Sequence, residues 1–293
     1  MNADLRTFWE RTRAELDRVD PAPRLEPAPE QSAREYTTQS VVLTGYEGVR
    51  LRGWYSLPKD PPRGGRFPAM LAVPGYGGEK AIPALAVLAG FAVLTLYPRA
   101  QGESKKEWDL PHGTKLTYHP TDRERFYYRA GYMDCVRGID FLAARPEVDP
   151  DRIGMWSRSQ GGGFTLATAS LDRRLAAAVA EQPFLCNYPV AVDVTTDPYV
   201  ELHDYLRQHP GQREEVLATL AYFDPLNLVD EIGYPTLVDI GMRDETCPYR
   251  TIAPVFERIR ALKSLLVYPE LGHSPCTDFN VHALSWLSRY LTG

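Results

Sequence analysis

The 293-residue sequence contains few cysteines, and they are not paired along the chain. The four are Cys135, Cys186, Cys247 and Cys276, and no CxxC or HExxH motif occurs. Disulfide-stapled secreted proteins and structural zinc sites both need closely spaced cysteines or histidines. We therefore expect four reduced thiols in a cytoplasmic protein that uses neither a metal nor another cofactor.

An excess of basic residues is also absent. Lys and Arg together number 33 and Asp and Glu number 38, which gives a formal net charge of −5. A nucleic-acid-binding protein needs clustered positive charge to neutralise phosphates, so the sequence argues against that class. The rest of the composition, 44% hydrophobic and 24% charged, is typical of a soluble globular protein.

No apolar run is long enough for a transmembrane helix. The longest uncharged run, 81–96, has 16 residues and is interrupted by Pro83 and Gly90, whereas a span needs about 18 or more. The first 20 residues carry acidic side chains and lack the apolar core of a secretory signal. We expect no membrane partner, and we interpret 81–96 as a helix, a cap at Gly90 and a buried strand.

Apolar patterning along the chain predicts an α/β protein. An amphipathic helix covers 2–19, and the prolines in 20–34 then predict an extended strap without regular structure. Apolar runs predict strands at Ser40–Thr44, Arg50–Leu57, Phe67–Val73, Phe91–Leu96, Arg152–Trp156, Ala176–Ala180, Thr236–Gly241 and Ser264–Tyr268. Helical patterns fill 124–144, 161–171, 250–262 and 277–291.

The strands differ in character along the chain. The early ones alternate between apolar and polar residues and the later ones are continuously apolar, which predicts a mostly parallel sheet with antiparallel early strands and helices on both faces. Residues 184–226 break the rhythm with helical pieces near 197–208 and 211–221, which indicates a cap-like excursion over the edge of the sheet where ligands bind. We expect 1–293 to form a single α/β domain, with the N-terminal helix and strap at 1–34.

The strongest chemical signal is the run Arg152–Phe164, a strand followed by a tight turn and a glycine-rich helix start. A nucleophile elbow of the G-x-S-x-G type needs small residues two positions before and after its serine. Ser159 satisfies this with Ser157 and Gly161, whereas Ser157 as nucleophile would place Met155 in the crowded position. A phosphate-binding loop is the alternative, but neither G-x-G-x-x-G before the helix nor a GK[ST] ending is present.

An acid and a histidine follow Ser159 in the chain order that such hydrolases use, each just past a predicted strand. Asp244 follows the strand 236–241, and His273 follows the strand 264–268. Asp239, inside its strand, is the second choice for the acid, and Glu245 is expected to be solvated. The other histidines do not follow late strands, and we expect them to be surface or helix residues: His112, His119, His203, His209 and His282.

A second glycine-rich loop, 73–78, follows the strand 67–73. In hydrolases with a nucleophile elbow, one N–H of such a loop and the N–H after the nucleophile hold the oxyanion. Those groups would be the backbone N–H of Tyr76 and that of Gln160. The alternative is that Gly75–Gly78 forms a simple turn.

These motifs resemble those of one known family. The chain is similar over most of its length to the acetyl xylan esterase and cephalosporin C deacetylase family of carbohydrate esterases. Besides the N-terminal helix and strap, the similar segments are Pro74–Gly78, Arg99–Gly102, Tyr127–Asp134, Ser159–Gly163, Gln182–Cys186, Ala221–Asp224, Asp244–Pro248 and Gly272–His273.

The resemblance implies an α/β-hydrolase fold, a cytoplasmic enzyme and hydrolysis of small acetyl esters on sugars and cephalosporins. It implies a triad of Ser159, Asp244 and His273, with Tyr76 and Gln160 as the oxyanion pair. It also implies a homo-oligomer, because in this family the region between the segments matching Gly102 and Tyr127 helps to build a hexamer; here that region is shorter.

The chain departs from the family at four positions. It has Ser157, Arg158, Ala100 and Ser274 where the family has Gly, a small residue, Gly and Glu. Arg158, next to the nucleophile, is a candidate substrate-site residue that would favour an acidic leaving group or narrow the entrance. Three alternatives remain: a general carboxylesterase, a serine peptidase of the prolyl oligopeptidase type, and a non-catalytic binding protein with a hydrolase fold.

Overall fold

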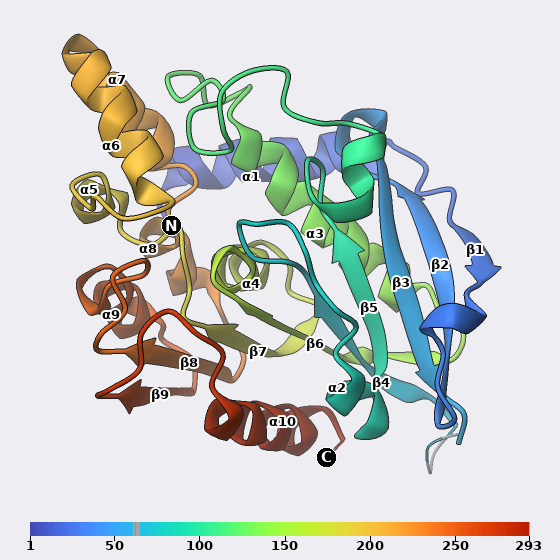
Figure 1. Cartoon of the computed structure of the whole chain (residues 1–293). Coiled ribbons are helices and arrows are strands. Elements are labelled where there is room, and N and C mark those ends of the chain that lie inside the picture. The colour runs from blue at the N-terminus through green and yellow to red at the C-terminus, as the bar shows by residue number, and fades with distance from the viewer. Residues whose placement is uncertain (61, 63–64, 293) are drawn as a thin grey trace.

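The computed structural model describes residues 1–60, 62 and 65–292, and its centre is one nine-stranded sheet (Figure 1). The strands are β1 (Arg24–Pro27), β2 (Tyr36–Thr44), β3 (Arg50–Pro58), β4 (Phe67–Ala72), β5 (Ala92–Tyr97), β6 (Val148–Arg158), β7 (Leu175–Glu181), β8 (Thr236–Gly241) and β9 (Lys263–Tyr268). Their order is β1-β2-β3-β5-β4-β6-β7-β8-β9. The pairs β1–β2, β2–β3 and β3–β5 are antiparallel. All the other pairs, including β4–β5, are parallel, as predicted.

Helices cover both faces of this sheet (Figure 1). They are α1 (Ala3–Asp17), α2 (Ala84–Leu88), α3 (Tyr127–Ala143), α4 (Gln160–Leu171), α5 (Tyr188–Ala191), α6 (Tyr199–Gln208), α7 (Arg213–Leu220), α8 (Pro225–Leu228), α9 (Tyr249–Arg258) and α10 (Thr277–Leu291). One apolar core holds α2 and α10 against the sheet, and a larger one holds α1, α3, α4 and α9 on the opposite side. The sheet is thus buried on both faces where its strands are parallel, which explains their continuous apolar runs.

The prediction of a strap without regular structure at 20–34 is wrong in part. Residues 24–27 form β1, which pairs with β2 from Arg24↔Val42 to Pro27↔Gln39. Proline removes a backbone donor but is tolerated at the edge of a sheet, where one side of the strand has no partner to satisfy. The prolines therefore placed this segment at the edge instead of excluding it from the sheet.

The predicted end of the helix at 250–262 is also wrong, because α9 stops at Arg258. The ammonium of Lys263 donates to the carbonyl oxygens of Phe256 and Glu257, both at 2.8 Å. A lysine that binds the last carbonyls of a helix satisfies acceptors left without intrahelical donors. By contrast, Gly90, at φ +97°, separates α2 from β5 as predicted.

The excursion at 184–226 contains α5 to α7 and the start of α8. The predicted pieces near 197–208 and 211–221 correspond to α6 and α7. Asp224 ties the segment to itself, because its carboxylate accepts the backbone N–H groups of Asn187 and Tyr188 at 2.8 and 2.7 Å. The two ends of the excursion are thus joined to each other.

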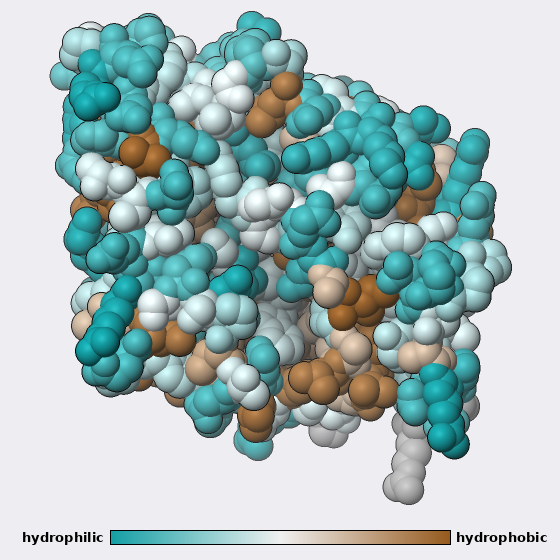
Figure 2. Space-filling model, viewed as in Figure 1, coloured by the Kyte–Doolittle hydropathy of each residue, from teal (hydrophilic) through white to brown (hydrophobic). Residues whose placement is uncertain are grey.

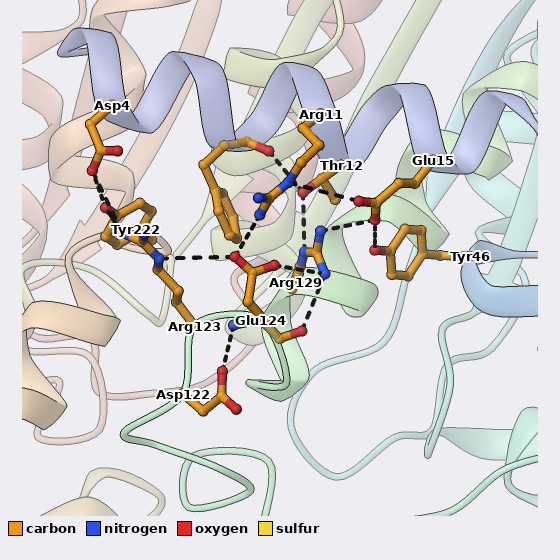
Figure 3. A network of polar contacts seen from close by, with 11 residues as sticks. Asp4, Arg11, Thr12, Glu15, Tyr46, Asp122, Arg123, Glu124, Arg129 and Tyr222 are labelled. Carbon is orange, nitrogen blue, oxygen red and sulfur yellow. Dashed lines mark hydrogen bonds and ion pairs between the residues drawn. The ribbon is translucent and has the colours of Figure 1, made fainter.

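Helix α1 is attached through a polar network to segments far away in sequence (Figure 3). Arg129, a buried residue of α3, donates to Glu15 of α1 at 2.9 Å and pairs with Glu124 at 3.1 Å. Asp4, at the other end of α1, accepts a hydrogen bond from Tyr222. The N-terminal helix therefore binds both the segment before α3 and the end of the excursion.

A buried ion pair fixes the turn after β5. The guanidinium of Arg99 donates to both carboxylate oxygens of Asp134, on α3, at 2.8 and 2.9 Å. Arg99 is 2% exposed and Asp134 is fully buried. Gln101, which contacts the site described below, follows directly on this anchored turn.

The surface is largely hydrophilic on the face shown in Figure 2, with apolar side chains gathered near α2. Leu85 and Leu88 of that helix are 59% and 54% exposed. All four cysteines are free thiols, as predicted. Among the described residues, no helix combines the length and apolarity needed to cross a membrane.

Candidate active site

Ser159 occupies the turn between β6 and α4. Its backbone has φ 59° and ψ −123°, a left-handed conformation that a non-glycine residue adopts only when its surroundings enforce it. The surroundings do so here, because its N–H donates to the carbonyl of Glu181 and its carbonyl accepts from the N–H of Phe184, both at 2.9 Å. The hydroxyl is thereby held at the end of the strand, where the residue is 7% exposed.

The elbow is too tight for larger side chains beside the serine. A Cβ atom on Gly161 would lie 2.6 Å from the Cβ of Ser157 and 2.8 Å from the carbonyl oxygen of Val73. Ser157 replaces the usual glycine without conflict, because its hydroxyl accepts the N–H of Val73 at 2.9 Å and donates to the carbonyl of Trp156 at 2.7 Å. Serine at position 157 therefore adds a hydrogen bond to Val73, the residue that follows β4.

His273 and Asp244 lie beside Ser159. His273, between β9 and α10, has its Nε2 3.0 Å from Ser159 Oγ and its Nδ1 2.8 Å from Asp244 Oδ2. Asp244, between β8 and α9, is buried. A carboxylate only accepts hydrogen bonds, so Nδ1 carries the proton and Nε2 is the acceptor for the serine hydroxyl.

The Asp244 carboxylate is fixed from behind. Its Oδ1 accepts the backbone N–H groups of Thr246 and Cys247 at 2.9 and 2.7 Å. Among the described residues, the one group with metal-ligand spacing is Asp244, Cys247 and His273. Burial raises the pKa of the Cys247 thiol well above its usual range. The Asp–His hydrogen bond accounts for this cluster without a metal.

The second glycine-rich loop passes over the serine. A Cβ atom on Gly75 would lie 3.6 Å from Ser159 Cβ, and the Gly75 carbonyl accepts the side-chain amide of Gln101 at 2.8 Å. In a trans peptide the carbonyl and the next N–H point in opposite directions, so this bond aims the N–H of Tyr76 away from Gln101. Gln160, the first residue of α4, carries one of the N–H groups that have no acceptor within the helix.

Asp239, the second choice for the acid, does not contact His273. It is fully buried in β8, and its Oδ1 accepts the backbone N–H of Gln182 at 2.7 Å. Burial raises the pKa of Asp239 to about 8. A carboxyl group that is neutral at pH 7 cannot stabilise an imidazolium, so both geometry and charge favour Asp244. Glu245 is exposed, as predicted.

Arg158 lies apart from the triad contacts. It is the last residue of β6 and the register partner of Glu181 on β7. Burial raises the pKa of Glu181, and the positive charges of Arg158 and Lys80 oppose that rise. The Nη1 atom of Arg158 is buried and makes no hydrogen bond to any described residue. Within the described part of the chain, one donor of the guanidinium is therefore unpaired next to Ser159.

Several residues that contact the site were not predicted from the sequence. The hydroxyl of Tyr128 donates to the side-chain oxygen of Gln160 at 2.9 Å, and Gln101 holds Gly75. Both lie in segments that carried the family resemblance, so that signal marked their location without giving their role. Lys115 and Glu201, which contact Tyr76, had no such signal.

A groove of about 740 Å³ opens beside the acid. It lies between residues 193–196 of the excursion and 242–250 of the loop that carries Asp244. Its lining combines charged and hydroxyl side chains with Met242 and Tyr249, which are 48% and 44% exposed. This volume lies in the usual range for small-molecule sites.

Comparison with known proteins adds a family and a fold. The family model described as acetyl xylan esterase (AXE1) matches residues 1–290. Acetyl esterase Axe7A from Xylanibacter ruminicola is 28% identical over 270 residues, which cover 87% of this chain and 61% of that protein. The chain thus spans less than two thirds of the length of this curated relative.

Two solved structures share the fold over nearly the whole chain. An acetyl xylan esterase from Paenibacillus sp. R4 is 30% identical, with a TM-score of 0.93 over 99% of this chain and 95% of that one. Acetyl xylan esterase 1 from Thermoanaerobacterium sp. is 29% identical, with a TM-score of 0.89 over 98% and 94%. The sheet order and these neighbours confirm the predicted α/β-hydrolase fold.

Proposed function

The chain belongs to the acetyl xylan esterase family of carboxylic ester hydrolases, and from this premise we propose that it hydrolyses acetyl esters through a triad of Ser159, His273 and Asp244. The observation that carries the proposal is the position of His273, whose two ring nitrogens lie within hydrogen-bond distance of Ser159 and Asp244. A nucleophile bonded to a base, which is oriented in turn by an acid, is the arrangement needed for covalent acyl transfer.

In the first half-reaction, the Ser159 hydroxyl attacks the ester carbonyl carbon. Its proton passes to Nε2 of His273, and the carbonyl π electrons move onto oxygen to give a tetrahedral oxyanion. Asp244 stabilises the imidazolium that forms. When the intermediate collapses, the bond to the alcohol oxygen breaks, and His273 returns the proton to the leaving alcohol. The acetyl group is left on Ser159.

In the second half-reaction, water replaces the alcohol. His273 takes a proton from the water as its oxygen attacks the acetyl carbon, and collapse of the second tetrahedral intermediate releases acetate and restores the serine hydroxyl. Both intermediates carry an oxyanion, and we assign its donors to the backbone N–H groups of Tyr76 and Gln160. Removal of one such donor costs about 10²–10³ in kcat.

The proposed substrates are small acetyl esters of sugars or related molecules, on the basis of the acetyl xylan esterases among its relatives. The groove of about 740 Å³ borders Asp244 but not Ser159 or His273, so it does not define the site of the alcohol. The positive charge of Arg158, the residue before Ser159, would favour acidic alcohols.

Initial rates on p-nitrophenyl esters from acetate to octanoate test the acyl preference. We expect kcat/KM to fall sharply after acetate or propionate, and acetylated xylose to release acetate. A flat or rising profile would leave the triad in place but make the protein a general carboxylesterase. Cleavage of an acyl-amino-acid p-nitroanilide at a comparable rate would favour the peptidase alternative instead.

A further inference from the structure

The proposed oxyanion donor, Tyr76, lies in a glycine-rich turn closed by a hydrogen bond from the Gly78 N–H to the Gly75 carbonyl at 3.1 Å. Tyr76 is flanked by Gly75, Gly77 and Gly78, and glycine adopts more backbone conformations than any other residue. A donor contributes fully only when it lies about 2.7–3.1 Å from the developing oxyanion. Contacts from outside the loop add to this turn bond in holding Tyr76 in one orientation.

Lys115 contacts both the backbone and the side chain of Tyr76. Its ammonium donates to the backbone carbonyl of Tyr76 at 2.9 Å and lies 4.2 Å from the centre of the Tyr76 ring. Lys115 belongs to the segment between β5 and α3, and it is only 8% exposed. The carbonyl bond fixes the peptide plane after Tyr76, and the cation–π contact fixes the side chain.

Glu201, on α6 of the excursion, supplies a second contact. The phenol hydroxyl of Tyr76 donates to its carboxylate. Burial raises the pKa of Tyr76, so the phenol keeps its proton and acts as the donor. The ring of Tyr76 also packs edge-on against that of Phe184, with 5.8 Å between the ring centres. The ring centre of Phe184 lies in turn 4.1 Å from that of Tyr199 on α6.

We propose that Lys115 is a positioning residue for the oxyanion hole and that Glu201 helps it to hold Tyr76 in place. This inference rests on the proposed function. Gln101 fixes the peptide plane that carries the Tyr76 N–H, and Lys115 fixes the plane that follows it. With both planes held, the backbone angles of Tyr76 are determined. The N–H of Tyr76 therefore keeps one direction despite the neighbouring glycines.

The alternative is that Lys115 only fills space. Burial lowers the pKa of Lys115 to about 8, with a further contribution from Lys105, while Glu201 and Asp109 oppose the shift. An ammonium buried at such a cost is a poor choice for packing, where methionine of similar length would serve. If packing were its role, Lys115→Met would be neutral or stabilising and would leave catalysis unchanged.

Steady-state kinetics on p-nitrophenyl acetate separate the two roles. We expect Lys115→Met to keep the melting temperature within a few degrees, to lower kcat at least tenfold and to change KM less than twofold. Lys115→Arg keeps a charged donor and should recover most of the lost kcat. Lys106→Met, at an exposed lysine of the same segment, is the matched control and should behave as wild type.

A transition-state analogue gives an independent readout. A methyl trifluoromethyl ketone forms a hemiketal with the serine and places an oxyanion in the same site. Its inhibition constant should rise for Lys115→Met in proportion to the loss of kcat. Tyr76→Phe, which removes the hydroxyl that binds Glu201 but keeps the carbonyl that binds Lys115, should show a smaller rise. Tyr76→Phe also carries the test if Lys115→Met does not fold.

A folded Lys115→Met with wild-type kcat and wild-type affinity for the ketone would overturn the inference. So would an equal loss in Lys106→Met, or Tyr76→Phe with unchanged kinetics in the case where Lys115→Met does not fold. A wild-type enzyme without Ser159-dependent esterase activity would instead overturn the proposed function itself. The two failures are therefore distinguishable in one set of assays.

Discussion

Replacement of Asp239 by asparagine is expected to change how the stability of the protein depends on pH. Asp239 is fully buried, and its Oδ2 makes no hydrogen bond to any described residue. Burial raises its pKa from 3.8 to about 8, so the folded protein holds a proton there at neutral pH that the unfolded chain has lost. Asparagine keeps the acceptor for the N–H of Gln182 but does not titrate.

The sign and size of the effect follow from linkage. Between the two pKa values the folded state binds more protons than the unfolded state, so the wild-type free energy of unfolding falls as pH rises. Each pH unit costs about 1.4 kcal/mol, so this residue removes about 4 kcal/mol between pH 5 and pH 8. Below about pH 4 this residue no longer makes the free energy of unfolding depend on pH, because Asp239 is then protonated in both the folded and the unfolded state.

Urea unfolding of wild type and Asp239→Asn at pH 5, 6, 7 and 8 measures this difference directly. The free energy of unfolding of Asp239→Asn relative to wild type should grow by about 4 kcal/mol across the series. Asp149→Asn is the control, because Arg152 lowers the pKa of Asp149, which is therefore ionised in both states over this range. A difference for Asp239→Asn that stays constant within about 1 kcal/mol would show that Asp239 is ionised in the folded protein over this pH range.

Three further outcomes follow from the contacts described above. Asp244→Asn should lower kcat on p-nitrophenyl acetate by about 10⁴ while the fold is kept, because His273 would lose the partner that sets its tautomer; a loss under tenfold would contradict the assignment. Gly161→Ala should lower both the melting temperature and kcat, because its Cβ has no space, whereas Gly211→Ala, in open space, should do neither. Arg99→Met should cost about 3–5 kcal/mol in urea unfolding, because it leaves the Asp134 carboxylate buried without its partner; unchanged stability would show that this ion pair is dispensable.

The sequence predicted the parts of the site that follow strand ends. Ser159, Asp244 and His273 each lie just after a parallel strand, and the carboxyl ends of such strands meet at one edge of the sheet. Small neighbours identified the elbow serine. The structure adds the distances and the reason why Asp244, and not Asp239, contacts the histidine: the side chain of Asp239 is turned to the backbone of Gln182.

Contacts between distant segments could not be predicted in the same way. Lys115 lies 39 residues from Tyr76 and Glu201 lies 125 residues away. Lys115 lies in an irregular segment, and Glu201 lies on α6, whose helical pattern does not show what its side chains contact. Their contacts with Tyr76 therefore depend on how these two segments pack against the loop. The pairing of β1 was missed for a related reason, because proline content describes local preference and not the position of a strand at the edge of a sheet.

We propose Ser159 as the nucleophile of an acetyl esterase, and the kcat of Ser159→Ala on p-nitrophenyl acetate is the most direct test of this role. Wild type and variant are compared at equal concentration after both show the same melting transition. The proposed mechanism predicts a fall on the order of 10⁶. A folded Ser159→Ala that retains more than about one hundredth of the wild-type kcat would contradict it.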